Sequence, residues 1–149
     1  CDEKTYDGEP AMKLESAAVG GRASEWDLSF FRNASTEVLS TRSLMKSALR
    51  EYKSSRSGDH HHISDIAASF QYNLARGIAG LAVHAAHDWD IPFIVLSGGV
   101  AYNRMIRETI IDQVREAGLE LFINAEYPLG DGCISFGQCR YAAALDTSA

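Results

Sequence analysis

A short apolar run that stops at two glycines, within FIVLSGGVAYNR (residues 93–104), constrains the fold of this chain more than any other stretch. Its first part, FIVLS, is typical of a strand inside a sheet that is covered on both faces. A helical pattern begins directly after Ser97-Gly98-Gly99, here called the SGG turn. A strand that ends in glycines at a helix start leaves bare backbone N–H groups pointing to one place, which suits a phosphate or another anion. An ordinary strand-to-helix turn uses the same residues, so this stretch alone leaves both interpretations open.

Strand and helix patterns alternate along the whole chain. A short helix is expected from Pro10 to a stop at Gly20-Gly21, and a long helix over residues 63–88 has large apolar residues such as Ile63 and Ile78 on one face. The alternation predicts one α/β domain over residues 1–149, with a mostly parallel or mixed sheet flanked by helices. The other predicted elements are a strand over 25–32, a helix over 35–53 that opens at Ser35 or Thr36, a strand over 93–97, a helix over 102–118, a strand over 119–123 and a helix over 133–146.

A second loop, residues 124–132 (here called the GDG loop), follows the strand predicted after the SGG turn. Ligands of α/β sheets bind at the carboxyl ends of the strands, where both loops leave the sheet. Asp131, between Gly130 and Gly132, can ligate a divalent cation, and the backbone N–H groups beside it can hold phosphate. The alternative is that Asp131 caps the last helix, because Asp is a preferred N-cap residue.

Asn103 follows the SGG turn and is predicted on the first turn of the next helix. Its side chain is then within reach of a ligand that sits on the glycines. Helix capping or solvent exposure is the alternative interpretation of this residue.

Charge and composition argue against several classes of protein. The net charge of −6 and the isoelectric point near 5.3 disfavour a nucleic-acid partner, because nucleic-acid modules are usually basic. No apolar run approaches the roughly 20 residues that cross a bilayer, so no membrane partner is expected. Three cysteines without a CxxC pair fit a reducing, cytoplasmic compartment. The run of residues 60–62, three histidines, is predicted in a polar loop, where consecutive imidazoles do not easily reach one metal ion.

Four segments carry a family resemblance that spans most of the chain. They occur in the same order as in the carboxy-terminal part of the HypF family, the carbamoyltransferases that act in the maturation of nickel–iron hydrogenases. The SGGVxxN pattern is shared with tRNA threonylcarbamoyladenosine synthases, and both families resemble the actin-like ATPase superfamily. The resemblance implies an actin-like, ribonuclease-H-like second lobe, so we expect the facing lobe and the upstream domains to lie outside this chain. The segments are TYDGEPAMKLE (5–15), DIAASFQYNLARGI (65–78), IVLSGGVAYNRMIRE (94–108) and YPLGDGCISFGQ (127–138).

The resemblance also implies roles for single residues. It implies that Gly98 and Gly99 contact nucleotide phosphates, that Asn103 lies near the base or ribose, and that Asp131 is a metal ligand. The remaining nucleotide contacts implied in this way are Gly132 on the phosphate side and Gly8 and Glu15 near the ribose.

The reaction that the resemblance implies is carbamoyl transfer. Enzymes of this kind make carbamoyl-adenylate from carbamoyl phosphate and ATP, and the actin-like domain passes the carbamoyl group to the carboxy-terminal cysteine of a HypE-type partner. That thiocarboxamide later becomes a cyanide ligand of the hydrogenase. Because the nucleophile is the partner's thiolate, this chain needs no catalytic Cys or Ser of its own.

Two alternatives stay open beside this interpretation. The first is a lobe of a tRNA threonylcarbamoyladenosine transferase, which the acidic charge argues against. The second is a non-catalytic module that docks a partner, which the presence of Gly98, Gly99 and Asp131 argues against. The paired metal-binding histidines of the family are expected upstream of this chain, so the lone lobe is not expected to catalyse the full reaction.

Overall fold

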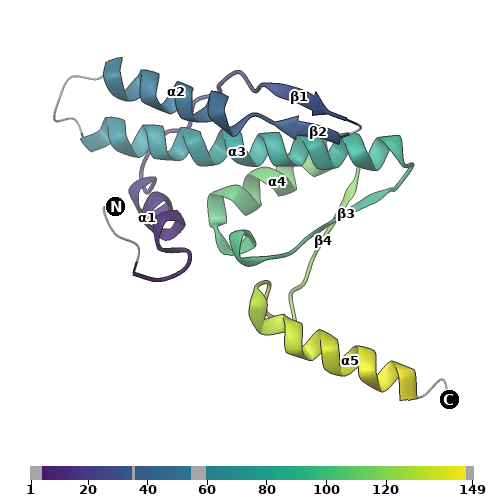
Figure 1. The fold of residues 1–149 in the computed structure, drawn as a ribbon. Coiled ribbons are helices and arrows are strands. Elements are labelled where there is room, and N and C mark those ends of the chain that lie inside the picture. Colours follow the sequence, from purple (N-terminus) through teal and green to yellow (C-terminus); the bar gives the residue numbers. More distant parts are fainter. Residues whose placement is uncertain (1–4, 35, 55–59, 147–149) are drawn as a thin grey trace.

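The computed structural model describes residues 5–34, 36–54 and 60–146 (Figure 1). The helices are α1 (Glu9–Ala17), α2 (Thr41–Ser54), α3 (His60–Asp88), α4 (Arg104–Glu116) and α5 (Ile134–Asp146), with short 3-10 turns η1 (Gly99–Tyr102) and η2 (Asp131–Cys133). The strands are β1 (Phe30–Asn33), β2 (Thr36–Leu39), β3 (Phe93–Leu96) and β4 (Glu120–Ile123). In the described ranges, no helix is both long and apolar enough to cross a membrane.

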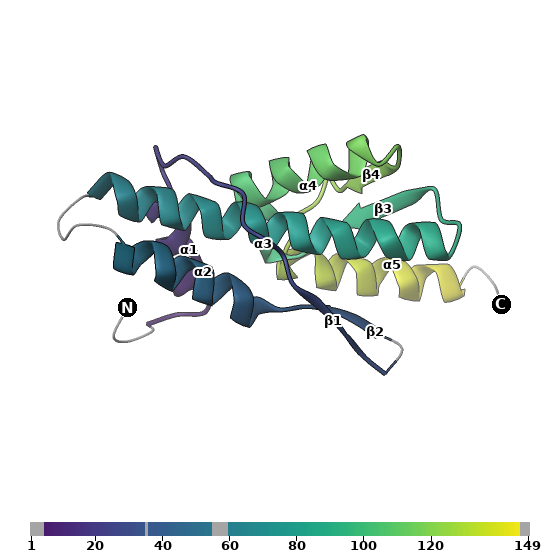
Figure 2. The same ribbon diagram turned by 90° about the horizontal axis from the view of Figure 1, so that it is seen from above.

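The long helix α3 is the centre of the molecule, and α1, α2 and α4 pack along it (Figures 1 and 2). Its buried stripe consists of small residues, including Ala75 and Ala79, which let α4 approach closely. The face predicted from the large apolar residues is only partly covered, since Ile63 and Ile78 are 48% and 41% exposed whereas Ile66 and Phe70 are half-buried. The histidines of residues 60–62, predicted in a loop, are instead in the first turn of α3.

The main core lies between α3, α4 and the parallel pair β3–β4. From α4 it takes Ile106, Ile110 and Val114, and from the strands the inward-facing Ile94 and Leu121. This core explains why the helix after the SGG turn is amphipathic, and it fixes the start of α4 relative to the end of β3.

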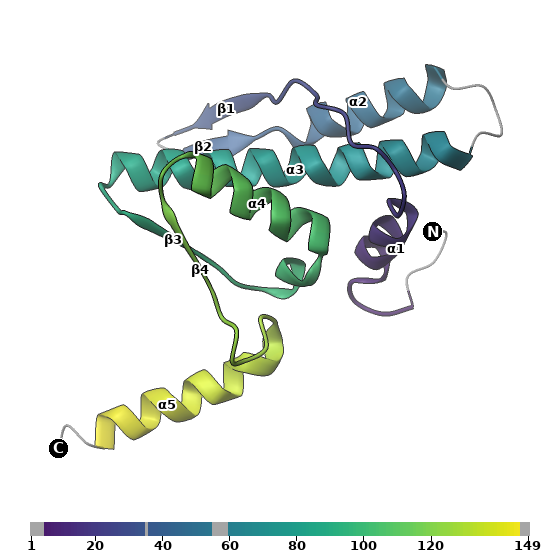
Figure 3. The same cartoon turned by 180° about the vertical axis from the view of Figure 1, so that it is seen from behind.

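Strands β3 and β4 pair in parallel, with Phe93 opposite Glu120 and Leu96 opposite Ile123. Burial alternates along both strands, and Val95 is 63% exposed. The expectation of a sheet covered on both faces is therefore wrong for this chain. The reason is visible in Figure 3: α3 and α4 cover one face of this pair, whereas α5 extends away from the body.

Strands β1 and β2 form an antiparallel hairpin that the sequence patterns misplace. The strand predicted over 25–32 begins only at Phe30, and the helix predicted to open at residues 35–36 begins at Thr41. Thr36 belongs to β2, and residue 35 lies outside the described residues. Leu39 of β2 is buried against α3 at Gly77, where a Cβ would overlap the Leu39 side chain. This long-range contact holds the segment as a strand.

Residues 22–26, here called the strap, run in extended form along α3 and hydrogen-bond to its side chains instead of to a strand. Every second residue of the strap meets every fourth residue of α3, because two extended residues and four helical residues both rise about 6 Å. The backbone N–H donors and their acceptors are Arg22 to Asp65 Oδ1 at 2.6 Å, Ser24 to Ser69 Oγ at 2.9 Å and Trp26 to Asn73 Oδ1 at 2.9 Å. These bonds hold residues 22–26 along α3, and the paired strand β1 begins only at Phe30.

Candidate nucleotide site

The SGG turn and the GDG loop lie side by side at the carboxyl ends of β3 and β4. The backbone N–H of Gly98 donates to the carbonyl of Leu129 at 2.7 Å. The hydroxyl of Tyr102 accepts from the N–H of Leu129 at 2.9 Å. Parallel pairing of the two strands thus brings both loops to one edge, as the sequence predicts.

The two glycines of the SGG turn differ in what they offer a ligand. Gly98 has φ 98° and ψ 163°, a conformation that essentially only glycine adopts, and its N–H is occupied by Leu129. In the described part of the chain, the N–H of Gly99 has no hydrogen-bond acceptor. A Cβ at Gly99 would meet open space. Of the two glycines, Gly99 is therefore the one with an N–H and room for an anion.

Asp131 begins η2, and the N-cap of this turn is Gly130. Its carboxylate is exposed, and within the described ranges it has no hydrogen bond or ion pair. The structure thus does not show the capping role that was the alternative for this residue. Gly132 lies one residue further along the same turn.

A complete metal site is not present in the part of the chain that the structure describes. No three His, Cys, Asp or Glu side chains gather there closely enough to hold an ion. A free carboxylate oxygen is a suitable ligand for a hard divalent cation, so Asp131 fits as one ligand among several. The other ligands of such a cation could include water and the phosphate oxygens of a nucleotide.

Asn103 is the N-cap of α4 and not part of its first turn. Its Oδ1 accepts from the N–H of Ile106 at 3.0 Å, and its Nδ2 donates to Oε1 of Gln71 at 2.6 Å. The capping alternative therefore holds in this structure. One amide hydrogen of Asn103 is still available to a ligand, and its predicted contact with a base or ribose stays a prediction.

Glu15 connects α1 to the same helix start, since its Oε1 accepts from the N–H of Arg104 at 3.2 Å. An ion pair with Glu108, in which Arg104 Nε donates at 2.8 Å, raises the pKa of Arg104. The structure therefore brings Glu15 and Asn103 together at the start of α4, next to the SGG turn.

Gly8 lies at the other end of α1, where it is the N-cap with φ 85°. Glu15 lies seven positions further along the helix, about 10 Å from Gly8. Next to it, the Lys13 ammonium at 2.7 Å and the N–H and hydroxyl of Thr5 hold the pKa of Glu9 below its usual value. In the described residues no hydrogen bond joins Gly8 to either loop, so its predicted ribose contact stays a prediction.

Sequence reasoning missed two residues of this site, Gln71 and Tyr102. Gln71 had a detectable signal, because it is a polar residue on the stripe of small residues that includes Ala68 and Ala75, and a buried amide requires partners. Tyr102 had none, because an aromatic residue after a glycine turn fits a helix start equally well.

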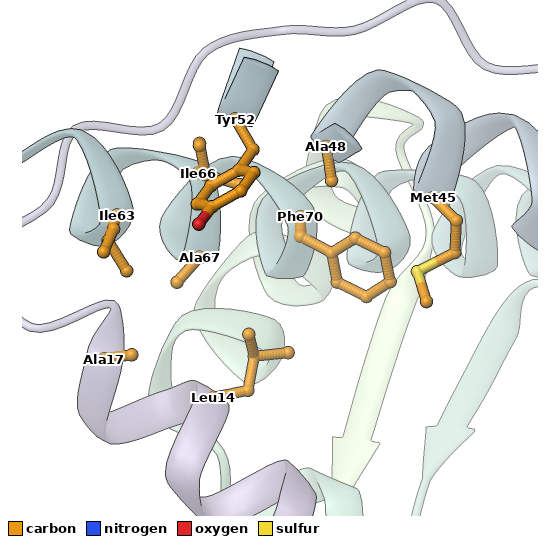
Figure 4. Close-up of a pocket in the computed structure, with 9 residues that line it drawn as sticks. All are labelled: Leu14, Ala17, Met45, Ala48, Tyr52, Ile63, Ile66, Ala67 and Phe70. Atoms are coloured by element: carbon orange, nitrogen blue, oxygen red, sulfur yellow. The ribbon is translucent and has the colours of Figure 1, made fainter. Parts of the chain in front are cut away.

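A separate apolar cleft lies between α1, α2 and α3, with a volume of about 350 Å³ (Figure 4). Among the described residues that line it, the only polar side-chain group is the hydroxyl of Tyr52, so they offer nothing to balance a phosphate charge. The predicted nucleotide site therefore does not coincide with it. The lining residues are Leu14, Ala17, Met45, Ala48, Tyr52, Ile63, Ile66, Ala67 and Phe70.

Comparisons with known proteins find relatives among the carbamoyltransferases and the tRNA threonylcarbamoyltransferases. A family model described as "Carbamoyltransferase, Kae1-like Domain, second subdomain" matches residues 1–138. The probable carbamoyltransferase HypF of Methanocaldococcus jannaschii is 32% identical over 139 residues, which are 93% of this chain and 17% of that protein. A tRNA N6-adenosine threonylcarbamoyltransferase of Syntrophomonas wolfei is 29% identical over 118 residues, which are 78% of this chain and 34% of that protein.

Two solved structures share the fold. The crystal structure of T. kodakarensis HypF is 36% identical, with a TM-score of 0.71, over 92% of this chain and 17% of that one. A full-length HypF in its phosphate- and nucleotide-bound form is 24% identical, with a TM-score of 0.72, over 91% of this chain and 17% of that one. The predicted fold class, an α/β lobe of the actin-like and ribonuclease-H-like kind, is confirmed. The chain spans about one sixth of the length of these HypF relatives.

Proposed function

Because this chain belongs to the HypF family of carbamoyltransferases, we propose that it forms one lobe of a nucleotide-binding carbamoyl-transfer site. One observation carries the proposal: the SGG turn and the GDG loop adjoin, and they present the N–H of Gly99 and the carboxylate of Asp131, neither of which has a partner among the described residues. The lobe comprises residues 1–149 as one domain. A facing lobe, outside this chain, completes the site.

In this proposal the nucleotide lies across the two loops. Gly98 and Gly99 face its phosphates, with Gly132 on the phosphate side of the GDG loop. Asn103 lies toward the base or ribose, and Gly8 and Glu15 lie toward the ribose. A full-length HypF with this fold was solved with phosphate and nucleotide bound, and this supports the proposal that the lobe binds a nucleotide.

The proposed reaction transfers a carbamoyl group from carbamoyl-adenylate to the carboxy-terminal cysteine of a HypE-type partner in the cytoplasm. The partner's thiolate sulfur forms a bond to the carbamoyl carbon, and the bond from that carbon to the phosphate oxygen breaks, so that AMP leaves with the electron pair. The N–H of Gly99 donates to the phosphate as its charge grows. A divalent cation held in part by Asp131 would neutralise more of that charge.

The tRNA-modifying relatives support an alternative, a lobe of a threonylcarbamoyl transferase. Binding to tRNA depends on Lys and Arg contacts with phosphates, whereas this chain carries 14 basic against 20 acidic residues. We therefore place hydrogenase maturation first. A non-catalytic docking module is disfavoured because such a module has no need for the glycine-only backbone of Gly98.

Replacement of Gly99 tests nucleotide binding directly. We expect MgADP to raise the thermal unfolding temperature of the wild-type chain, since ligand at 100 times its Kd adds about 2.7 kcal/mol of stability. Gly99→Val should abolish this shift without unfolding the protein, because its side chain enters open space where the phosphate would lie. Differential scanning calorimetry at several MgADP concentrations measures both effects.

The matched control is Gly80→Ala in α3, where a new Cβ also meets open space but lies on the central helix. This variant should keep the full MgADP shift. An equal shift in Gly99→Val would contradict phosphate binding at the SGG turn. If neither this chain nor a longer HypF protein containing it responds to MgADP, the proposed function is wrong.

A further inference from the structure

Gln71 connects three helices at the edge of the candidate site. The side chain is 2% exposed and belongs to α3. Its Nε2 donates to the carbonyl of Leu14 in α1 at 3.1 Å and to the carbonyl of Ala67 at 3.2 Å. Its Oε1 accepts from Nδ2 of Asn103, the N-cap of α4, at 2.6 Å. Its partners outside α3 are 57 and 32 residues away in sequence.

The donors and acceptors in this chain of bonds fit in only one order. The Asn103 oxygen must face Ile106, whose N–H donates to it, so the Asn103 amide nitrogen must face Gln71. The Gln71 oxygen must then face Asn103, so the Gln71 nitrogen must face the carbonyl of Leu14. Turning either amide over would set a donor against a donor. Each amide therefore fixes the orientation of the other.

Two hydrogen bonds beside this chain of amides hold the start of α4. Glu15, which follows Leu14 in α1, accepts from the N–H of Arg104, the first residue of α4. Asn103, on the Gln71 side, accepts from Ile106 two residues further along. Loss of Gln71 would remove the bonds that join α1 and Asn103 through α3, and it would thereby loosen the start of α4. The turn η1, which contains Gly99, directly precedes Asn103 in the chain.

We propose that Gln71 is a positioning residue of this site: its buried amide holds Asn103, and through it the turn from Gly99 into α4, in the orientation that receives the nucleotide. The inference rests on the proposed function for the nucleotide, but the orientation of Asn103 can be measured without any ligand. A residue that only stabilised α3 would change neither the orientation of Asn103 nor the affinity for the nucleotide.

Asn73 provides a matched control. It is also a buried amide on α3, two residues further along, but it bonds the strap and not α4. Both Gln71→Leu and Asn73→Ala remove a buried amide from the same helix, so both should lower stability. Only Gln71→Leu should disturb the start of α4.

The first measurement is amide hydrogen exchange by NMR on the free chain, well below the unfolding temperature of either variant. We expect Gln71→Leu to speed exchange at the N–H groups of Arg104 and Ile106 by about tenfold or more relative to Asn73→Ala. Asn73→Ala should instead speed exchange at the N–H groups of Ser24 and Trp26. Unchanged exchange at Arg104 and Ile106 in Gln71→Leu would overturn the positioning role, whether or not nucleotide binds.

The second measurement is the Kd for MgADP, with a double-mutant cycle. Gln71→Leu should raise this Kd about tenfold, and Asn73→Ala should change it less than twofold. Asn103→Ser keeps a cap but loses the bond to Gln71, so adding Gln71→Leu to it should have little further effect. Independent, additive effects would overturn coupling through Asn103. Altered exchange in Gln71→Leu with no MgADP binding in any form would contradict the proposed function and leave the positioning of Asn103 intact.

Discussion

Replacing Asp131 with alanine in a full-length HypF protein that contains this segment is expected to lower carbamoyl transfer by roughly 100-fold or more, with little effect on folding. Loss of one preorganised group that stabilises developing charge commonly has an effect of this size. The fold should persist because the carboxylate is exposed and has no partner in the described part of the chain. The measurement is the mass gain of the partner's carboxy-terminal peptide over time.

The GDG loop offers its own control for this experiment. Glu126 lies in the same loop and its carboxylate is exposed. Among the described residues, its hydrogen bond is made by the backbone N–H, which donates to Asn124 Oδ1. Glu126→Ala removes the same charge from the same loop and should leave transfer within about twofold. Normal transfer by Asp131→Ala would rule out its role as a metal ligand. Equal losses in both variants would instead point to the general charge of the loop.

The elements around the site follow from local sequence because they are bounded by residues with specific backbone demands. The SGG turn and the GDG loop each follow an apolar run, and parallel pairing then places both loops at one edge. The hairpin does not follow in this way. Residues 36–39 continue the helical spacing of α2, but they pair with β1, and Leu39 packs against Gly77, 38 residues away.

Contacts between distant segments also explain what sequence reasoning missed in the site. The orientation of Asn103 depends on Gln71, and that of Gln71 depends on a carbonyl of α1. No local pattern encodes such a chain of amides. The exposed face of β3–β4 is a second case, since an apolar run predicts burial but not which segment supplies the cover.

Replacing Asn73 with alanine is expected to cause the largest loss of stability of the variants considered, about 3 kcal/mol. The side chain is fully buried and makes four hydrogen bonds. Its amide accepts from the N–H of Trp26 and from Arg76, and it donates to the carbonyls of Ser24 and Ser69. Each buried polar group left without a partner costs about 1–3 kcal/mol, and two of these groups belong to the strap backbone. Urea denaturation followed by circular dichroism gives the change in unfolding free energy.

The strap makes this loss specific to Asn73. Gly21 brings the strap against α3 so closely that a Cβ there would overlap the carbonyl of Ser64, so the backbone has little room to find new partners. Gln113→Ala is the control, because its amide makes one exposed hydrogen bond, to Glu116 in the same helix, and its loss should cost under about 0.5 kcal/mol. If Asn73→Ala lowers the unfolding free energy as little as Gln113→Ala does, water replaces the hydrogen bonds of Asn73. The strap would then be held by Asp65, Ser69 and the side-chain contacts of Glu25 and Trp26.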